Sequence, residues 1–242
     1  MPMKILLSGA TGRIGRTLAE LVADDPDARI VGTASRDAFF EAGAAGDVVI
    51  DFSRPALCRA SAAWAAERRI PFVSGTTGLD RAADEALAAA ARRVAVCHAA
   101  NFSVGVNLLI ELVERAAASL DARFDIEIAE LHHRWKHDAP SGTALALGRA
   151  AARARGLADG DAGGRLRTGE RHAGEIGFQC ARGGDVAGEH AVRFLGDGER
   201  IELIHRAADR SIFARGALHA ARWIIGRPAG LYGMPDVLRA GR

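Results

Sequence analysis

The sequence predicts an α/β protein in which a parallel-sheet domain is joined to an α+β domain with a mostly antiparallel, open sheet. In the first hundred residues, short apolar runs alternate with Ala-rich stretches of helical periodicity, and the connections are short and contain glycine. This alternation is typical of a parallel sheet with helices on both faces. After Asn101 the pattern changes to longer helices and half-exposed strands separated by Gly-rich turns, which indicates a second domain.

The first half of the chain has the pattern of alternating strand and helix. Short apolar runs indicate buried strands, and Ile14, Leu18 and Val22 have the spacing of an amphipathic helix. We expect strands at residues 4–8, 29–33, 47–52, 71–74 and 94–97, and helices at 13–23, 58–69 and 80–92.

The second half contains a long amphipathic pattern, a strand of alternating apolar and acidic residues, and several Gly-rich turns. We expect helices at 106–120, 144–155 and 216–225, a strand at 124–131, a mobile loop at 157–171, and three antiparallel strands near 174–181, 188–194 and 199–205. The predicted dinucleotide-binding domain is therefore 1–104 with 208–242, and the predicted substrate-binding domain is 105–207. Because open antiparallel strands need a covered face, we expect oligomerisation through the second domain.

Composition limits the classes of function. The chain is 49% hydrophobic and 26% charged, which is an ordinary balance for a globular protein and excludes wholesale disorder. A net charge of +2 with scattered basic residues does not favour nucleic acid, and no apolar run approaches the ~18 residues of a membrane span. The start of the chain leads straight into a strand, so we expect a cytoplasmic protein, with Cys58, Cys97 and Cys180 as reduced thiols.

A glycine-rich string follows the first expected strand and precedes the first helix. Glycines there permit a sharp turn and a close approach to a pyrophosphate, while the helix start offers N–H groups to it. We therefore predict a Rossmann-like dinucleotide site, the alternative being a tight turn without a ligand. The predicted contacts in this string are Gly9, Ala10, Thr11, Gly12, Arg13 and Ile14.

The residues after the second strand suggest which dinucleotide is bound. An NAD site usually places an acid about 20 residues after the glycines, where this chain has Ser35 followed by Arg36. A hydroxyl beside a guanidinium suits a 2′-phosphate, so we expect NADPH to be preferred and NADH to be possible. The nearby Asp37 weakens this preference, and Arg36 as a solvated loop residue is the alternative.

The densest group of reactive side chains lies in residues 132–143, between an expected strand and an expected helix. Its Ser141-Gly142-Thr143 end presents backbone N–H groups at a helix start, which suits a carboxylate. Lys136 adds a movable positive charge, and a histidine such as His132 exchanges protons at physiological pH. The segment therefore predicts an anion-binding, proton-handling site.

Two alternatives apply to this segment. His132, His133, His137 and Asp138 are metal-ligand types, but neighbours on an extended chain point to opposite sides, and Lys136 would repel a cation. We therefore expect no metal. The other alternative is a polar loop with incidental histidines.

These strings together resemble the 4-hydroxy-tetrahydrodipicolinate reductase (dihydrodipicolinate reductase) family of lysine and diaminopimelate biosynthesis. The resemblance covers essentially the whole chain. Besides residues 9–15 and 132–143, it rests on VIDFSRP at 49–55, GTTG at 75–78, AANFSVG at 99–105, GEH at 188–190, GER at 198–200 and MPDVL at 234–238.

The resemblance implies roles for individual residues. His132 is implied as the acid/base residue and Lys136 as the proton donor or charge stabiliser, and His133, Ser141, Gly142 and Thr143 are implied to contact substrate. The nicotinamide end of the cofactor is implied at Gly75, Thr76, Thr77, Ala99, Ala100, Asn101 and Phe102, and Phe52 is implied as a further cofactor contact. The chain departs from many relatives at Ser35, where they carry an acid, and between Arg36 and Asp47, which is a shorter stretch here.

The implied reaction reduces a cyclic imine dicarboxylate, 4-hydroxy-tetrahydrodipicolinate, with loss of water, in a homotetramer. Hydride from the cofactor would add to the conjugated ring, with the cofactor pocket facing the 132–143 pocket across a cleft. Two alternatives remain: another NAD(P)-dependent dehydrogenase of a small substrate, and a catalytically inactive NADP-sensing regulator.

Overall fold

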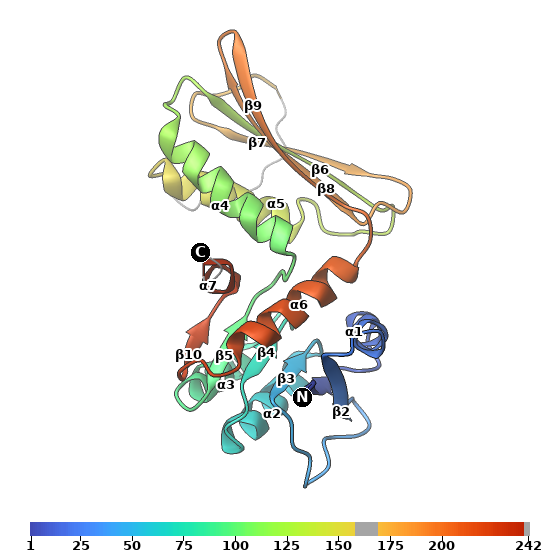
Figure 1. The fold of residues 1–242 in the computed structure, drawn as a ribbon. Coiled ribbons are helices and arrows are strands. Elements are labelled where there is room, and N and C mark those ends of the chain that lie inside the picture. The colour runs from blue at the N-terminus through green and yellow to red at the C-terminus, as the bar shows by residue number, and fades with distance from the viewer. Residues whose placement is uncertain (158–168, 240–242) are drawn as a thin grey trace. The chain divides into compact units, whose positions relative to one another are not determined.

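The computed structural model describes residues 1–157 and 169–239 (Figure 1). The chain divides into two compact units, one comprising Met1–Val104 with Ser211–Arg242 and the other Gly105–Arg210. None of the described helices is both long and apolar enough to cross a membrane.

The first unit is built on a six-stranded sheet in which every pairing is parallel, as predicted. The strand order is β10-β5-β4-β3-β1-β2, so the chain leaves β1 in one direction for β2 and returns on the other side to β3. Ligands bind such sheets at the carboxyl ends of the strands where the order reverses, which here are the ends of β1 and β3. The strands are β1 (Met3–Ser8), β2 (Ala28–Ala34), β3 (Val48–Asp51), β4 (Phe72–Ser74), β5 (Ala95–His98) and β10 (Gly230–Tyr232).

Helices cover both faces of this sheet, as the alternating pattern predicts (Figure 1). On one face α1 packs beside α6, with Leu18 and Ala217 in the same apolar core. On the other face α2 packs beside α3, with Ala62 and Leu87 buried together. The helices of this unit are α1 (Arg13–Ala23), α2 (Pro55–Glu67), α3 (Arg81–Ala91), α6 (Ser211–Ile224) and α7 (Met234–Arg239).

The second unit is a four-stranded sheet in the order β7-β6-β8-β9, with an apolar core between it and two helices. β8 runs antiparallel to both β6 and β9, and β7 runs parallel to β6. The strands are β6 (Asp125–His132), β7 (Ile176–Arg182), β8 (Gly188–Gly196) and β9 (Glu199–Ala207), and the helices are α4 (Val104–Ser119) and α5 (Gly142–Ala154).

The structure corrects three expectations. β7 was expected to be one of three consecutive antiparallel strands, but it lies beside β6 and runs parallel to it, because the chain crosses over through α5. β10 and α7 were not predicted, since three and six residues are too few for a hydrophobic period to show. α2 starts at Pro55 and not at residue 58, because proline is favoured in the first turn. The loop predicted at 157–171 lies mostly outside the described residues.

Candidate functional site

The glycine turn after β1 has a geometry that only glycine permits. Gly9 has φ of +82°, and a Cβ there would lie 2.2 Å from the carbonyl oxygen of Phe52. A Cβ on Gly15 would likewise lie 2.2 Å from the carbonyl oxygen of Gly9. Gly12 is the N-cap of α1 and supplies no capping side chain, so the first amides of the helix are not bonded to a cap oxygen. The turn therefore presents backbone N–H groups in the way a phosphate requires.

A cavity of about 580 Å³ lies beside this turn, entirely within the first unit. The N-cap residues of two helices line it, Gly12 of α1 and Arg54 of α2, and neither helix has a side-chain cap. Two guanidinium-bearing residues, Arg36 and Arg54, also belong to the lining. Helix N-termini and arginines favour negative charge, so the cavity suits an anionic ligand. The lining residues are Gly9, Thr11, Gly12, Ser35, Arg36, Phe52, Ser53, Arg54, Ala56, Leu57 and Ala60.

This lining includes five of the eight residues predicted for the phosphate and ribose end, namely Gly9, Thr11, Gly12, Ser35 and Arg36. Ala10, Arg13 and Ile14 are not part of it. The lining residues that were not predicted are Ser53, Arg54, Ala56, Leu57 and Ala60. Arg54 lies inside the VIDFSRP string and directly precedes Pro55, so a predicted helix start at Pro55 would have identified it.

The predicted nicotinamide-end segments are held together at the carboxyl ends of β3, β4 and β5. The Phe52 ring packs against the backbone of Gly75, where a Cβ would lie 2.2 Å from a ring carbon. The rings of Phe52 and Phe102 are 5.6 Å apart in an edge-to-face arrangement. The Ala99 amide donates to the carbonyl oxygen of Ser74 at 3.2 Å. The structure thus brings residues 52, 75–76 and 99–102 together, with Thr77 and Ala100 exposed beside them.

A buried carboxylate ties two of these segments to the sheet. Asp51, at the end of β3, is fully buried and accepts hydrogen bonds from the hydroxyls of Ser53 at 2.5 Å, Ser74 at 2.9 Å and Thr76 at 2.6 Å. The Ser53 amide in turn donates to Thr76 Oγ1 at 2.9 Å. Phe52 and Gly75 are therefore flanked by residues that are hydrogen-bonded to one carboxyl group.

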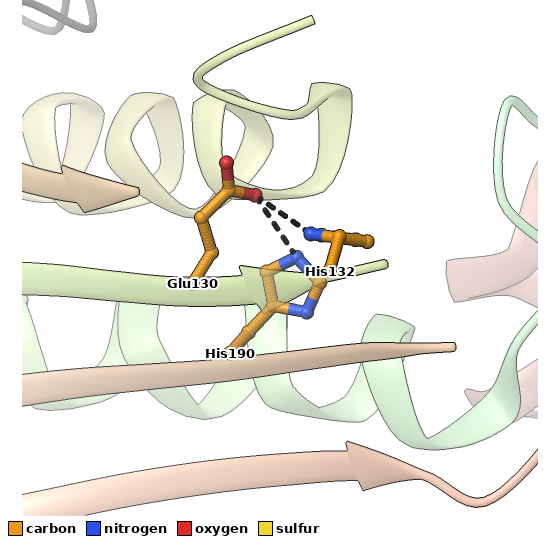
Figure 2. Close-up of side chains that lie close together, drawn as sticks. All are labelled: Glu130, His132 and His190. Carbon is orange, nitrogen blue, oxygen red and sulfur yellow. Dashed lines mark ion pairs between the residues drawn. The ribbon is translucent and has the colours of Figure 1, made fainter. Parts of the chain in front are cut away.

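In the second unit, the end of β6 carries a cluster of three buried side chains (Figure 2). Glu130 and His132 are two residues apart on β6 and so point to the same face, and His190 of β8 is the direct cross-strand partner of Glu130. His132 Nδ1 lies 3.3 Å and His190 Nε2 3.7 Å from Glu130 Oε2. Of these three residues, sequence reasoning identified only His132.

The other oxygen of Glu130 has its own partners. Oε1 accepts from Arg182 Nη2 at 2.8 Å and from the Ser141 amide at 3.0 Å. Burial by itself would raise the pKa of Glu130, but the interactions of the carboxylate with His132, Ser141 and Arg182 outweigh burial and hold that pKa well below its usual range. Glu130 is therefore a buried anion at neutral pH.

His190 is a buried neutral base. Burial, together with the neighbouring His132, lowers its pKa to about 4 even though Glu130 acts in the opposite direction. Its Nε2 lies 3.2 Å from Ser141 Oγ, which also accepts from the Ala144 amide as the N-cap of α5. The Ser141 hydroxyl and His190 Nε2 are therefore hydrogen-bonded to each other, and either atom can be the donor. Ser141, which was predicted to bind substrate, is only 2% exposed. Its hydroxyl caps the N-terminus of α5.

The low pKa of His190 makes stability depend on pH. Between about pH 6.5 and 4 the unfolded chain binds a proton on this residue that the folded chain does not, so stability falls as pH falls through this window. The expected loss is roughly 3 kcal/mol in the free energy of unfolding, measured by urea denaturation at several pH values. His190→Asn should lose less stability over the same window. Equal pH slopes for the two proteins would contradict this interpretation.

The remaining predicted residues of the 132–143 segment lie around this cluster. Lys136 Nζ donates to both oxygens of Asp138, at 2.7 and 2.8 Å, and lowers the pKa of that carboxyl group. His133 Nε2 lies 2.7 Å from Arg210 Nη2, an arginine that was not predicted. Gly142 is exposed and Thr143 half-buried at the start of α5, where the helix offers N–H groups to an anion.

Sequence reasoning weighed, and did not favour, a metal site formed by His132, His133, His137 and Asp138. Among the described residues, the group that could hold a metal ion is Glu130, His132 and His190, whose ligand atoms lie within 4.8 Å of one another. Glu130 could have been noticed from its two-residue spacing to His132. His190 could not, because it joins the cluster only through the register of β6 and β8.

Two family models match the chain, one over most of each structural unit. Residues 3–102 match the family model for the N-terminus of dihydrodipicolinate reductase, and residues 105–238 match that for its C-terminus. The chain is 47% identical to a 4-hydroxy-tetrahydrodipicolinate reductase of Dinoroseobacter shibae, over 97% of both chains. It is also 47% identical to one of Methylocella silvestris, over 99% of this chain and 98% of the relative.

Solved structures give the same fold. The dipicolinate-bound dihydrodipicolinate reductase from Paenisporosarcina sp. TG-14 superposes with a TM-score of 0.76 at 21% identity, over 98% of this chain and 99% of that chain. A diaminopimelate dehydrogenase of C. glutamicum superposes with a TM-score of 0.53 at 15% identity, over 98% of this chain and 95% of that chain.

Proposed function

This chain belongs to the dihydrodipicolinate reductase family, and from that membership we infer that it reduces 4-hydroxy-tetrahydrodipicolinate to tetrahydrodipicolinate with loss of water, at the expense of NAD(P)H. This reaction is a step of lysine and diaminopimelate biosynthesis. The observation that carries the inference is the 47% identity to curated reductases over nearly the full length of both chains.

The cavity in the first unit fits a nicotinamide dinucleotide. Two uncapped helix starts and the close backbone approach at Gly9 suit a pyrophosphate, and the segments around Phe52, Gly75 and Phe102 would hold the nicotinamide end. When bound, the nicotinamide supplies the hydride. We propose NADPH as the preferred donor because Arg36 and Arg54 line the same cavity and a 2′-phosphate adds negative charge.

Residues of the second unit would bind and protonate the substrate. We propose that Lys136 and the α5 start at Gly142 and Thr143 bind a carboxylate of the ring, with His133 in contact with the substrate. Lys136 now pairs with Asp138, whose side chain is 58% exposed, so a substrate carboxylate can replace it at small cost. His132 would supply the proton that completes reduction, and Lys136 would stabilise charge that develops on the ring.

The test is a coupled assay with the purified protein. The condensation product of pyruvate and aspartate semialdehyde is mixed with enzyme and NADPH, and the loss of NADPH absorbance is followed. We expect consumption that requires both precursors. A different dehydrogenase would ignore this substrate, and a regulator would bind NADPH without consuming it.

We further propose a cytoplasmic homotetramer assembled through the sheet of the second unit. Ile204 of β9 lies across from Ala191 on the sheet face opposite the apolar core and is 41% exposed, as expected for a face that is covered only in an assembly. Light scattering after gel filtration should give about four times the 25.4 kDa of one chain. A mass of one chain at micromolar concentration would contradict this assembly.

A further inference from the structure

The two oxygens of the buried Glu130 carboxylate have different partners, and Figure 2 shows the two histidines that face one of them. Oε1 of Glu130 holds Arg182 and the Ser141 amide. Oε2 lies 3.3 Å from Nδ1 of His132, which is within ion-pair distance, and neither of these two buried atoms has a hydrogen bond of good geometry to any described residue. Because the carboxylate is an anion that only accepts hydrogen bonds, a proton on the facing Nδ1 is the arrangement that the carboxylate favours.

The other ring nitrogen of His132, Nε2, has space beside it because residue 188 is a glycine. Nε2 lies over Gly188 of β8, where a Cβ would come within 3.0 Å of it. It makes no hydrogen bond to any residue that the structure describes, and the side chain of His132 keeps 10% of its surface exposed. The ring thus has one nitrogen turned inward to a fixed anion and one nitrogen available for proton exchange.

His190 is not a second positive charge beside the Glu130 carboxylate. His190 is neutral at physiological pH for the reasons given above, and its Nε2 is occupied by the Ser141 hydroxyl at 3.2 Å. Its ring stands edge-to-face against His132, with centroids 5.1 Å apart, and so limits rotation of the His132 ring.

We propose that Glu130 is a positioning residue for the reductase reaction: its carboxylate holds the Nδ1 proton of His132 and thereby reserves Nε2 for proton transfer to the substrate. The proposal rests on the proposed function for the identity of the reaction. Glu130 itself touches no substrate in this account, and it also stabilises the imidazolium from which the proton is donated.

A competing use of the same atoms is a metal site, since two imidazole nitrogens and a carboxylate oxygen converge there. Arg182 lies 2.8 Å from the same carboxylate, and a cation would add positive charge beside that guanidinium. We therefore expect that EDTA leaves activity unchanged and that added Zn²⁺ does not raise it. Loss of activity in EDTA with recovery in Zn²⁺ would overturn the proposal in favour of a metal site.

The test has one readout that is independent of turnover. Nitrogen-15 NMR of the wild-type imidazoles, with the His132 signals assigned by their loss in His132→Gln, should show Nδ1 protonated when His132 is neutral. In Glu130→Gln this preference should weaken, because an amide can donate to Nδ1 as well as accept from it. A wild-type ring protonated on Nε2 would overturn the proposal, whether or not any variant folds.

The second readout is kinetic. Glu130→Gln should lower kcat by roughly ten- to a hundredfold and alter the pH profile of kcat/KM, with KM for NADPH unchanged. The matched control is Glu127→Gln, which removes another buried carboxylate of β6 that is ion-paired to Arg171 but lies on the strand face opposite to His132. Its kcat should stay within about threefold of wild type. Equal losses in the two variants, or no loss in Glu130→Gln, would overturn the positioning role.

Failure of the proposed function is separable from failure of this inference. If the wild type does not consume the pyruvate–aspartate semialdehyde product, the assigned reaction is wrong. The NMR measurement would still decide whether Glu130 sets the tautomer of His132.

Discussion

Replacing Lys136 with alanine should lower kcat by about two to three orders of magnitude while NADPH still binds with unchanged affinity. The reason is that Lys136 would carry the positive charge nearest to the developing negative charge on the ring and would also bind a substrate carboxylate. Steady-state kinetics give kcat, and fluorescence titration of NADPH gives the affinity of the first unit.

Two controls make this result specific. Lys4, the other lysine of the chain, belongs to β1 of the first unit, so Lys4→Ala should leave kcat unchanged. Lys136→Arg keeps the charge but does not release a proton near neutral pH. Partial recovery in Lys136→Arg would indicate charge stabilisation, and no recovery would indicate proton donation. Unchanged turnover in Lys136→Ala would remove this residue from the mechanism.

Replacing Arg36 with alanine should raise KM for NADPH at least tenfold and raise KM for NADH much less. Arg36 lines the cavity of the first unit beside Ser35, where a 2′-phosphate would add negative charge that NADH lacks. Its guanidinium lies 3.8 Å from Asp37 with both side chains largely exposed, so the ion pair costs little to exchange. KM for both cofactors is measured at fixed, saturating substrate.

The control is another arginine of the same region. Arg29 is exposed on β2 and does not line the cavity, so Arg29→Ala should leave both KM values unchanged. If Arg36→Ala raised KM for NADPH and NADH equally, the guanidinium would not be reading the 2′-phosphate, and the preference for NADPH would lose its physical basis.

The first unit could be predicted closely from sequence because its structure depends on local patterns. Helix α1 lies at Arg13–Ala23, as its apolar spacing indicates, and Asp80 caps α3 at the expected boundary. The glycine turn was recognisable because Gly9 follows a strand and precedes a helix. Short elements such as β10 were not predicted because three residues are too few to show a hydrophobic periodicity.

The second unit was harder to predict because its key contacts are non-local. The position of β7 beside β6 depends on a crossover that no local pattern records. The pairing of Glu130 with His190 depends on the register of two strands 60 residues apart in the chain. His132 and Lys136 were found from their residue types alone, whereas the residues that orient them required the folded sheet.

We propose that a dinucleotide held at the glycine turn reduces a dicarboxylate held by residues 132–143. A crystal structure with NADPH and dipicolinate, the ligand of the Paenisporosarcina relative, tests it most directly. We predict Lys136 and the amides of Gly142 and Thr143 on a carboxylate, His132 Nε2 facing the ring, and nicotinamide C4 about 3–3.5 Å from a ring atom. Dipicolinate bound elsewhere, or far from the nicotinamide with His132 turned away from it, would contradict the account.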